Sequence, residues 1–272
     1  MIPPMFVNAR ETFMTIWAML SGIEGNLAAY EAVLADLKRQ RTEIDELYIL
    51  GDLVGATSES EDLVQRVRSP RRGEIEPQVC AGWWEEQCFI LHGVSTQSEA
   101  PELIAKYGAD TVKLLWDAVP HETVKWLRSL NFGFFELDSL LIHGSTVGVD
   151  DELTPKTSPV QMLDRLMRSD ANNLFCGRSG LTFEYELHQG SVTVAVTTLD
   201  RQQEPIVNTV SPRRVIGVGN VGRSPGKATY TLYDPGINHV EFKTIRYGGT
   251  GFKVAQMARS AQGEHKPKNS RV

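Results

Sequence analysis

Three side chains that could bind a metal ion or a phosphate group lie beside glycines. Glu24 sits in a tight turn that contains two glycines, Asp52 directly follows a glycine, and His143 directly precedes one. Carboxylate oxygens and imidazole nitrogens are ligands that suit manganese, iron and zinc in proteins. Asp52 also has a plain structural interpretation, because an acid after a strand often serves as a turn residue or helix cap.

Apolar segments precede the first two of these residues and must position them. Residues 15–20 form a nearly unbroken apolar run, which predicts a strand covered on both faces. Residues 27–37 have the apolar spacing of an amphipathic helix, and Asn26 stands at its expected N-cap. Residues 47–50 predict a second strand. Such strand, turn and helix units present side chains at the carboxyl edge of a parallel sheet, where ligands of open α/β folds collect.

The remaining sequence predicts further strands and helices, with an exposed loop over 69–79. From residue 182 onward, Thr, Val, Tyr and Phe alternate with polar residues, which is typical of antiparallel sheet. Strands are expected at 88–91, 132–137, 140–142, 173–176, 182–200, 206–218 and 228–246, and helices at 61–68, 101–107, 109–118, 121–130 and 158–168.

The composition is that of an ordinary globular protein and argues against several functions. The chain has 272 residues and a net charge of −6, which gives no case for binding nucleic acid or an anionic membrane surface. No apolar run approaches the roughly 20 residues that span a bilayer. No signal-peptide pattern opens the sequence, and the three cysteines suit reduced thiols, so we expect a cytoplasmic protein. These cysteines are Cys80, Cys88 and Cys176.

We expect one domain over residues 14–250, because no internal repeat or long low-complexity linker divides the chain. Residues 1–13 are interpreted as a leader. Residues 251–272 are polar and basic, and they are interpreted as a disordered tail.

The order of the glycine-containing segments resembles the calcineurin-like metallophosphoesterases, in particular their small bacterial and archaeal branch. That family carries Asp-x-His-Gly-Asn, Gly-Asp, Gly-Asn-His-Asp, His-Gly and Gly-His-Thr-His motifs in this order. Flanking sequence agrees as well, so that the resemblance covers roughly residues 14–247. The corresponding segments here are 22–26, 51–52, 92–95, 143–144 and 177–180.

The resemblance implies an α/β fold, a four-layer α/β/β/α sandwich of two mixed β-sheets flanked by helices. It also implies a site where two divalent metals activate a water molecule and clamp a phosphate. Several family ligands are replaced in this chain. The Asp and His of the first motif correspond to Gly22 and Glu24, the Asn and His of the third to Val94 and Ser95, and the two His of the fifth to Arg178 and Gly180.

Of the family's ligands, only Asp52 and His143 remain, and this loss predicts that two metals no longer bind tightly. Buried carboxylates without a counter-ion would be costly. We therefore expect Arg178 to occupy the vacated metal position and to pair with Asp52 or Glu24, because a guanidinium matches the geometry of a carboxylate. The alternative is that Arg178 is a surface substitution in a loop that has diverged.

These departures favour a pseudoenzyme that needs no cofactor and that binds a ligand or a protein partner. Asn26, Arg178 and Arg223 are the candidate residues for holding a phosphate-containing small molecule. The 69–79 loop and the pair Trp83–Trp84 are candidate partner surfaces, although tryptophan more often packs inside a protein.

Two catalytic alternatives stay open. A reduced, mononuclear site with manganese, iron or zinc could hydrolyse phosphomonoesters, phosphodiesters or nucleotides. Its metal ligands would be Glu24, Asp52, His143 and His92. A metal-free hydrolase could instead use Ser21 or Ser95 with His143, although no nucleophile elbow supports it.

Overall fold

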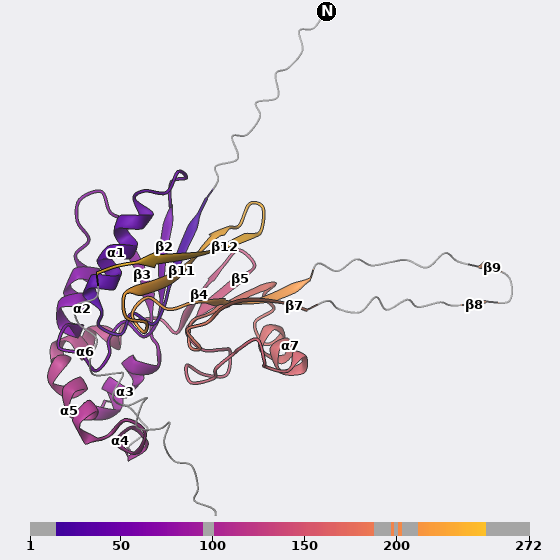
Figure 1. Cartoon of the computed structure of the whole chain (residues 1–272). Helices are drawn as coiled ribbons and strands as arrows, with labels where there is room; N and C mark the ends of the chain where they lie inside the picture. Colours follow the sequence, from indigo (N-terminus) through magenta and orange to yellow (C-terminus); the bar gives the residue numbers. More distant parts are fainter. Residues whose placement is uncertain (1–14, 95–100, 188–196, 199–200, 203–211, 249–272) are drawn as a thin grey trace, which may run out of the picture.

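The computed structural model describes residues 15–94, 101–187, 197–198, 201–202 and 212–248. The leader expected at 1–13 and the tail expected at 251–272 lie outside the described residues. Figure 1 shows two sheets beside each other, with helices α1 to α6 gathered on one side of them and α7 on the other.

Two mixed five-stranded sheets form the centre of the fold. In the first sheet β1, β2 and β3 run parallel, and β11 pairs antiparallel with β1 and β12. In the second sheet β5, β6 and β10 run parallel, and β4 and β7 are antiparallel edges. In the first sheet the spatial order of the strands is β12 (His239–Arg246), β11 (Lys227–Asp234), β1 (Trp17–Leu20), β2 (Glu46–Leu50) and β3 (Pro77–Cys80). In the second sheet the order is β4 (Gly133–Glu136), β5 (Ser139–Ile142), β6 (Asn173–Cys176), β10 (Arg213–Val218) and β7 (Thr182–Leu187). A short separate pair is β8 (Thr197–Thr198) and β9 (Arg201–Gln202).

The helices of the described residues connect and cover these strands. The first begins at its predicted N-cap, where Asn26 Oδ1 accepts a hydrogen bond of 3.0 Å from the Ala29 amide. The helices are α1 (Leu27–Leu37), α2 (Ser60–Arg68), α3 (Trp83–Leu91), α4 (Pro101–Tyr107), α5 (Ala109–Ala118), α6 (His121–Leu127) and α7 (Pro159–Met167).

Three apolar clusters join the layers. One packs Leu20 of β1 against Tyr30 of α1 and other helical side chains. The second lies between the two sheets and contains Met19 and Phe175. The third joins the outer face of the second sheet to Met162 of α7. Neighbouring residues of β1 thus face opposite layers, as strand geometry requires, and the predicted four-layer sandwich of two mixed sheets is confirmed.

The predicted strand at 88–91 is wrong, because these residues belong to α3. The third strand of the first sheet is β3, which begins inside the segment predicted as a loop, 69–79. A run of four apolar residues does not distinguish a strand from a helix. β3 was not predicted because it begins with Pro77 and Gln78, and only its last two residues are buried. This correction moves the loop that follows the third strand from 92–95 to the segment that starts at Ala81.

The remaining predicted helices and strands are present wherever the structure describes them. The strands expected over 182–200 and 206–218 are described only as β7, β8 and β10, and the rest of these ranges lies outside the described residues. The three cysteines are buried and free. Among the described residues, no helix has the length and apolar character needed to cross a membrane.

The N-cap of α1 gives a first testable prediction. Besides capping the helix, the Asn26 side chain donates to the Tyr247 hydroxyl at 2.7 Å and to the Gly222 carbonyl at 3.3 Å. We expect Asn26→Ala to lower the free energy of unfolding by about 1–3 kcal/mol in urea titrations, because the cap and buried bonds are lost. Asn26→Asp keeps the capping oxygen, so its free energy of unfolding should fall less than that of Asn26→Ala. Equal stability of Asn26→Ala and the unchanged protein would contradict this assignment.

Candidate functional site

Loops from both sheets meet at the carboxyl ends of the parallel strands. The loop after β1 carries Glu24 and the loop after β2 carries Asp52, and the two are tied by a bond of 2.9 Å from the Glu24 amide to the Asp52 carbonyl. Both residues have positive φ, 52° and 53°, which is uncommon for residues other than glycine. Such backbone geometry is found at sites whose surroundings fix it.

Asp52 is fully buried and lies at the centre of the site. Its Oδ1 accepts a bond of 2.9 Å from the Trp84 amide and lies 3.3 Å from His143 Nε2. Its Oδ2 accepts a bond of 2.7 Å from Arg223 Nη2. Burial alone would raise the pKa of Asp52, but His143, Arg223, Arg178 and the Trp84 amide together hold that pKa below its usual value. Asp52 is therefore a carboxylate at neutral pH.

His143, the second residue that matches the motifs of the resemblance, faces Asp52. Its Nδ1 lies 2.8 Å from the Leu50 carbonyl, so Nδ1 carries the proton of the neutral ring. Burial lowers the pKa of His143 although Asp52 opposes this shift. Its Nε2 is buried and has no hydrogen-bond partner among the described residues. The imidazole thus directs Nε2 at the Asp52 carboxylate, whose Oδ1 lies 3.3 Å away.

Arg223, from the loop between β10 and β11, neutralises both acids. Its Nε donates to Glu24 at 2.6 Å, its Nη2 donates to Asp52 at 2.7 Å, and its Nη1 donates to the Arg178 carbonyl at 2.8 Å. The side chain is only 10% exposed. Charge-assisted bonds of this length are among the strong hydrogen bonds of proteins. One guanidinium therefore links loops that follow strands of both sheets.

Two glycines make the room that this guanidinium occupies. A Cβ atom added at Gly22 would lie 2.9 Å from Arg223 Nε, and one added at Gly180 would lie 2.7 Å from Arg223 Nη1. Both glycines have positive φ as well. By the resemblance above, these are the positions of an Asp and a His ligand. The Arg223 guanidinium therefore lies where side chains at positions 22 and 180 would otherwise project.

Arg178 enters the site but makes a looser contact than predicted. Its Nη1 lies 3.9 Å from Asp52, and its guanidinium lies 4.7 Å from the centre of the Trp83 ring. Its buried Nε has no hydrogen-bond partner among the described residues. Arg223, which we had considered only as a ligand-binding residue, makes the close ion pairs instead. Sequence spacing gave no signal for this, because 171 residues separate Arg223 from Asp52.

The first turn of α3, the helix that follows β3, contributes a buried acid that sequence reasoning missed. Glu85 accepts hydrogen bonds from the backbone amides of Asp52, Gly82 and Val54 at 2.9, 2.8 and 3.0 Å. Burial and the charge of Asp52 raise the pKa of Glu85 to about 7. Glu85 thus fixes the backbone of the Asp52 loop. The signal in the sequence was the order Gly82-Trp-Trp-Glu85, which has the spacing of the third family motif.

His92 does not join the site. It caps the C-terminal end of α3 and stacks on Trp116 with ring centroids 4.2 Å apart. His92 stands seven positions after Glu85 along this helix, which corresponds to about 10 Å along the axis. The predicted alignment of the third motif at 92–95 is therefore wrong, and so is the assignment of His92 as a metal ligand.

The candidate nucleophiles and phosphate-binding residues are engaged elsewhere. The Ser21 hydroxyl donates to the Leu50 carbonyl at 2.6 Å, and Ser95 lies outside the described residues. Asn26 uses its side-chain oxygen and nitrogen in bonds within the protein. Arg223 has partners for all three of its nitrogens. Among these candidates, Arg178 is the residue with an unused donor nitrogen.

The residues present do not fit a divalent metal pair. In the described part of the chain, no group of three or more His, Cys, Asp and Glu side chains is arranged to hold a metal ion. Glu24 and Asp52 are oriented around a guanidinium, which stays protonated in proteins and cannot ligate a metal. His143 Nε2 remains as a suitable donor. One imidazole and two acids that are both paired with Arg223 are fewer free ligands than a two-metal site needs.

Comparison with solved structures identifies the fold as that of the metallophosphoesterases. The chain superposes on a metallophosphoesterase from Sphaerobacter thermophilus with a TM-score of 0.61 and 19% identity, over 86% of this chain and 90% of that chain. A cold-active protein-tyrosine phosphatase from a psychrophilic Shewanella superposes with a TM-score of 0.45 and 16% identity, over 86% of this chain and 81% of that chain. A protein serine/threonine phosphatase from Saccharomyces cerevisiae superposes with a TM-score of 0.42 and 10% identity, over 89% of this chain and 82% of that chain. No protein-family model and no curated protein matches the sequence.

The ion pairs of Arg223 predict a large stability loss on truncation. Arg223→Ala leaves Glu24 and Asp52 without their closest counter-ion, so we expect the free energy of unfolding to fall by about 3–5 kcal/mol in urea titrations. The difference in unfolding free energy between Arg223→Ala and the unchanged protein should become smaller at acidic pH, where the carboxyls of Glu24 and Asp52 can be protonated. Arg214→Ala is the matched control, because Arg214 is equally buried but pairs with the partly exposed Glu184. An equal, pH-independent loss in both variants would contradict the proposed role of Arg223.

Glu85 predicts a pH dependence of stability. Its pKa rises from about 4.5 to about 7 on folding, so the native state binds the extra proton between these values. The contribution of Glu85 to stability should therefore fall as pH rises through this window, by up to roughly 1.4 kcal/mol per pH unit. The difference in unfolding free energy between the unchanged protein and Glu85→Gln, measured from pH 5 to 8, should show this fall. A difference that grows with pH would refute it.

Proposed function

We propose that this protein, which has the metallophosphoesterase fold, does not hydrolyse phosphoric esters with divalent metals and acts instead by binding. The observation that carries the proposal is the Arg223 guanidinium between Glu24 and Asp52, at 2.6 and 2.7 Å. A positive charge that belongs to the chain stands between the acids that would otherwise attract a metal ion. Hydrolysis that depends on two metals needs that position for the metals.

The surrounding residues support the same proposal. Gly22 and Gly180 offer no ligand atoms, and side chains at these positions would collide with Arg223. The start of α3 brings Trp83 and Trp84 to the positions where the resemblance implies polar side chains. Trp84 contacts Asp52 through its backbone amide. These replacements favour a site that is held together by the chain itself.

Arg178 is the residue that we propose for contact with a bound phosphate-containing small molecule. Its side chain is 13% exposed, its Nε lacks a partner in the described structure, and its guanidinium lies over the Trp83 ring, 4.7 Å from the ring centre. A guanidinium that is held by an aromatic ring has lost part of its freedom already, and it can donate two parallel bonds to a phosphate. A protein partner that presents a phosphate or carboxylate at this edge would use the same contact.

The proposal predicts neither tight metal binding nor metal-dependent turnover. The purified protein should be incubated with manganese, washed, and assayed for bound metal and for hydrolysis of bis-p-nitrophenyl phosphate. We expect less than stoichiometric metal and a rate equal to that of Asp52→Ala, the matched control. Stoichiometric metal together with turnover that Asp52→Ala abolishes would overturn the proposal in favour of a reduced, active site.

The variant Arg223→Ala tests whether the guanidinium is what keeps manganese out of the site. Removal of the guanidinium leaves Glu24, Asp52 and His143 Nε2 around the space that it occupied, with Arg178 Nη1 3.9 Å from Asp52. A ligand that binds only the native state raises the melting temperature. Manganese should therefore raise the melting temperature of Arg223→Ala and leave that of the unchanged protein and of Arg214→Ala unaltered.

A further inference from the structure

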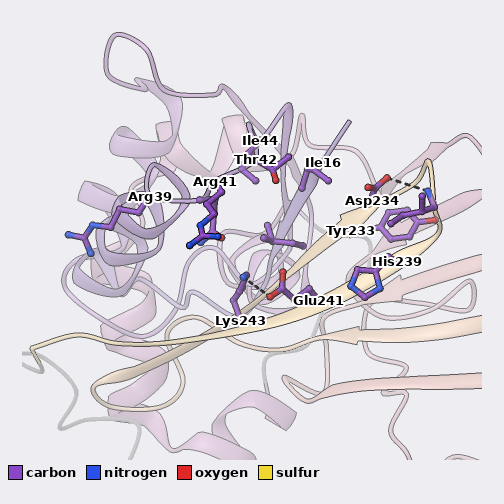
Figure 2. A pocket seen from close by; sticks show the side chains of 13 residues that line it. Ile16, Arg39, Arg41, Thr42, Ile44, Tyr233, Asp234, His239, Glu241 and Lys243 are labelled. Carbon is purple, nitrogen blue, oxygen red and sulfur yellow. Dashed lines mark hydrogen bonds and ion pairs between the residues drawn. The ribbon is translucent and has the colours of Figure 1, made fainter. Parts of the chain in front are cut away.

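A second cleft lies at the opposite end of the first sheet from the Arg223 site. It has a volume of about 510 Å³ and is lined by the start of β1, the segment 39–44 after α1, and residues of β11 and β12. Figure 2 shows this cleft from close by. Pockets for small ligands in proteins have volumes of roughly 300–1,000 Å³, so the cleft is large enough for a small organic molecule.

The floor of the cleft is apolar. Ile16, Ile44 and Leu232 line it, and each is at most 8% exposed. These side chains come from three separate parts of the chain, which the first sheet brings together. A ligand that covers them would need an apolar body, because a polar group placed there would lose its bonds to water.

Two of the three basic side chains that line the cleft, Arg39 and Arg41, have no ion pair with a described residue. Lys243 pairs with Glu241 at 2.6 Å, and Asp234 Oδ1 accepts bonds from the Gly236 and Ile237 amides at the turn between β11 and β12. No ion pair joins Arg41 to another described residue. Arg39, Arg41 and Lys243 stand against Asp234 and Glu241, so the lining carries one net positive charge within a chain of net charge −6.

The orientation of the two arginines differs. In Figure 2 the nitrogen end of Arg41 points toward the side of the cleft where Lys243 lies, whereas the guanidinium of Arg39 points away from the cleft. The two residues are close in sequence and carry the same charge. They therefore form a natural pair of test and control positions.

We propose that this cleft binds a small amphipathic organic anion, with its apolar body on Ile16, Ile44 and Leu232 and its anionic group at Arg41. The ligand class follows from the combination of an apolar floor with an unpaired guanidinium at the rim. A neutral molecule of the same shape gains only the apolar contact, and an inorganic anion gains only the charge. Binding here is independent of the function proposed for the Arg223 site.

The test uses 8-anilinonaphthalene-1-sulfonate, an aromatic anion that fluoresces in apolar surroundings, with the full-length native protein. We expect saturable binding of one molecule. Arg41→Glu should weaken binding at least tenfold, because the guanidinium is replaced by a repelling charge, whereas Arg39→Glu should change it less than about twofold. N-phenyl-1-naphthylamine, which has the same rings without the sulfonate, should bind at least tenfold more weakly than the anion.

Three results would overturn the proposal. Equal effects of Arg41→Glu and Arg39→Glu would show that only overall charge matters. Equal affinity for the two probes would show an apolar surface without preference for an anion. Binding that appears only after proteolytic removal of residues 1–12 would assign the cleft to that segment of the chain instead.

Discussion

One buried guanidinium holds the candidate site together. Arg223 binds the loops after β1 and β2 through Glu24 and Asp52, and the loop after β6 through the Arg178 carbonyl. Loops from both sheets thus share one cation. A buried acid pair without a positive partner would be unstable, and a buried arginine without acids would be equally costly. Each side of this arrangement therefore requires the other, and the glycines at 22 and 180 supply the space that both need.

Much of the fold could be predicted from the sequence because its elements are locally consistent. The apolar run of β1, the glycine turn and the Asn26 cap each indicate the same unit, and the structure has it. The prediction failed where local patterns were ambiguous. The apolar residues at 88–91 form the last turn of a short helix, in which Cys88 alone of the four is fully buried, and β3 is a strand of four residues that begins with proline. Neither has a length or period that separates a strand from a helix.

The site was harder to predict than the fold, for a physical reason. Asp52 and His143 were identified because they match positions of a family motif, and the structure brings them within 3.3 Å of each other. Glu85 and the role of Arg223 depend on contacts between distant segments. No spacing in the sequence reveals that a guanidinium fits between two particular carboxylates. The error at the third strand also displaced the third motif, which is why His92 was considered and Glu85 was not.

The central claim is that a cation belonging to the chain stands where metals would be required for hydrolysis. The most direct test is a crystal structure of the unchanged protein grown with millimolar manganese, with diffraction data that record the anomalous signal of the metal. The account predicts the Arg223 guanidinium in density between Glu24 and Asp52, with no anomalous peak beside them. A manganese peak within bonding distance of Asp52, with Arg223 displaced, would contradict it.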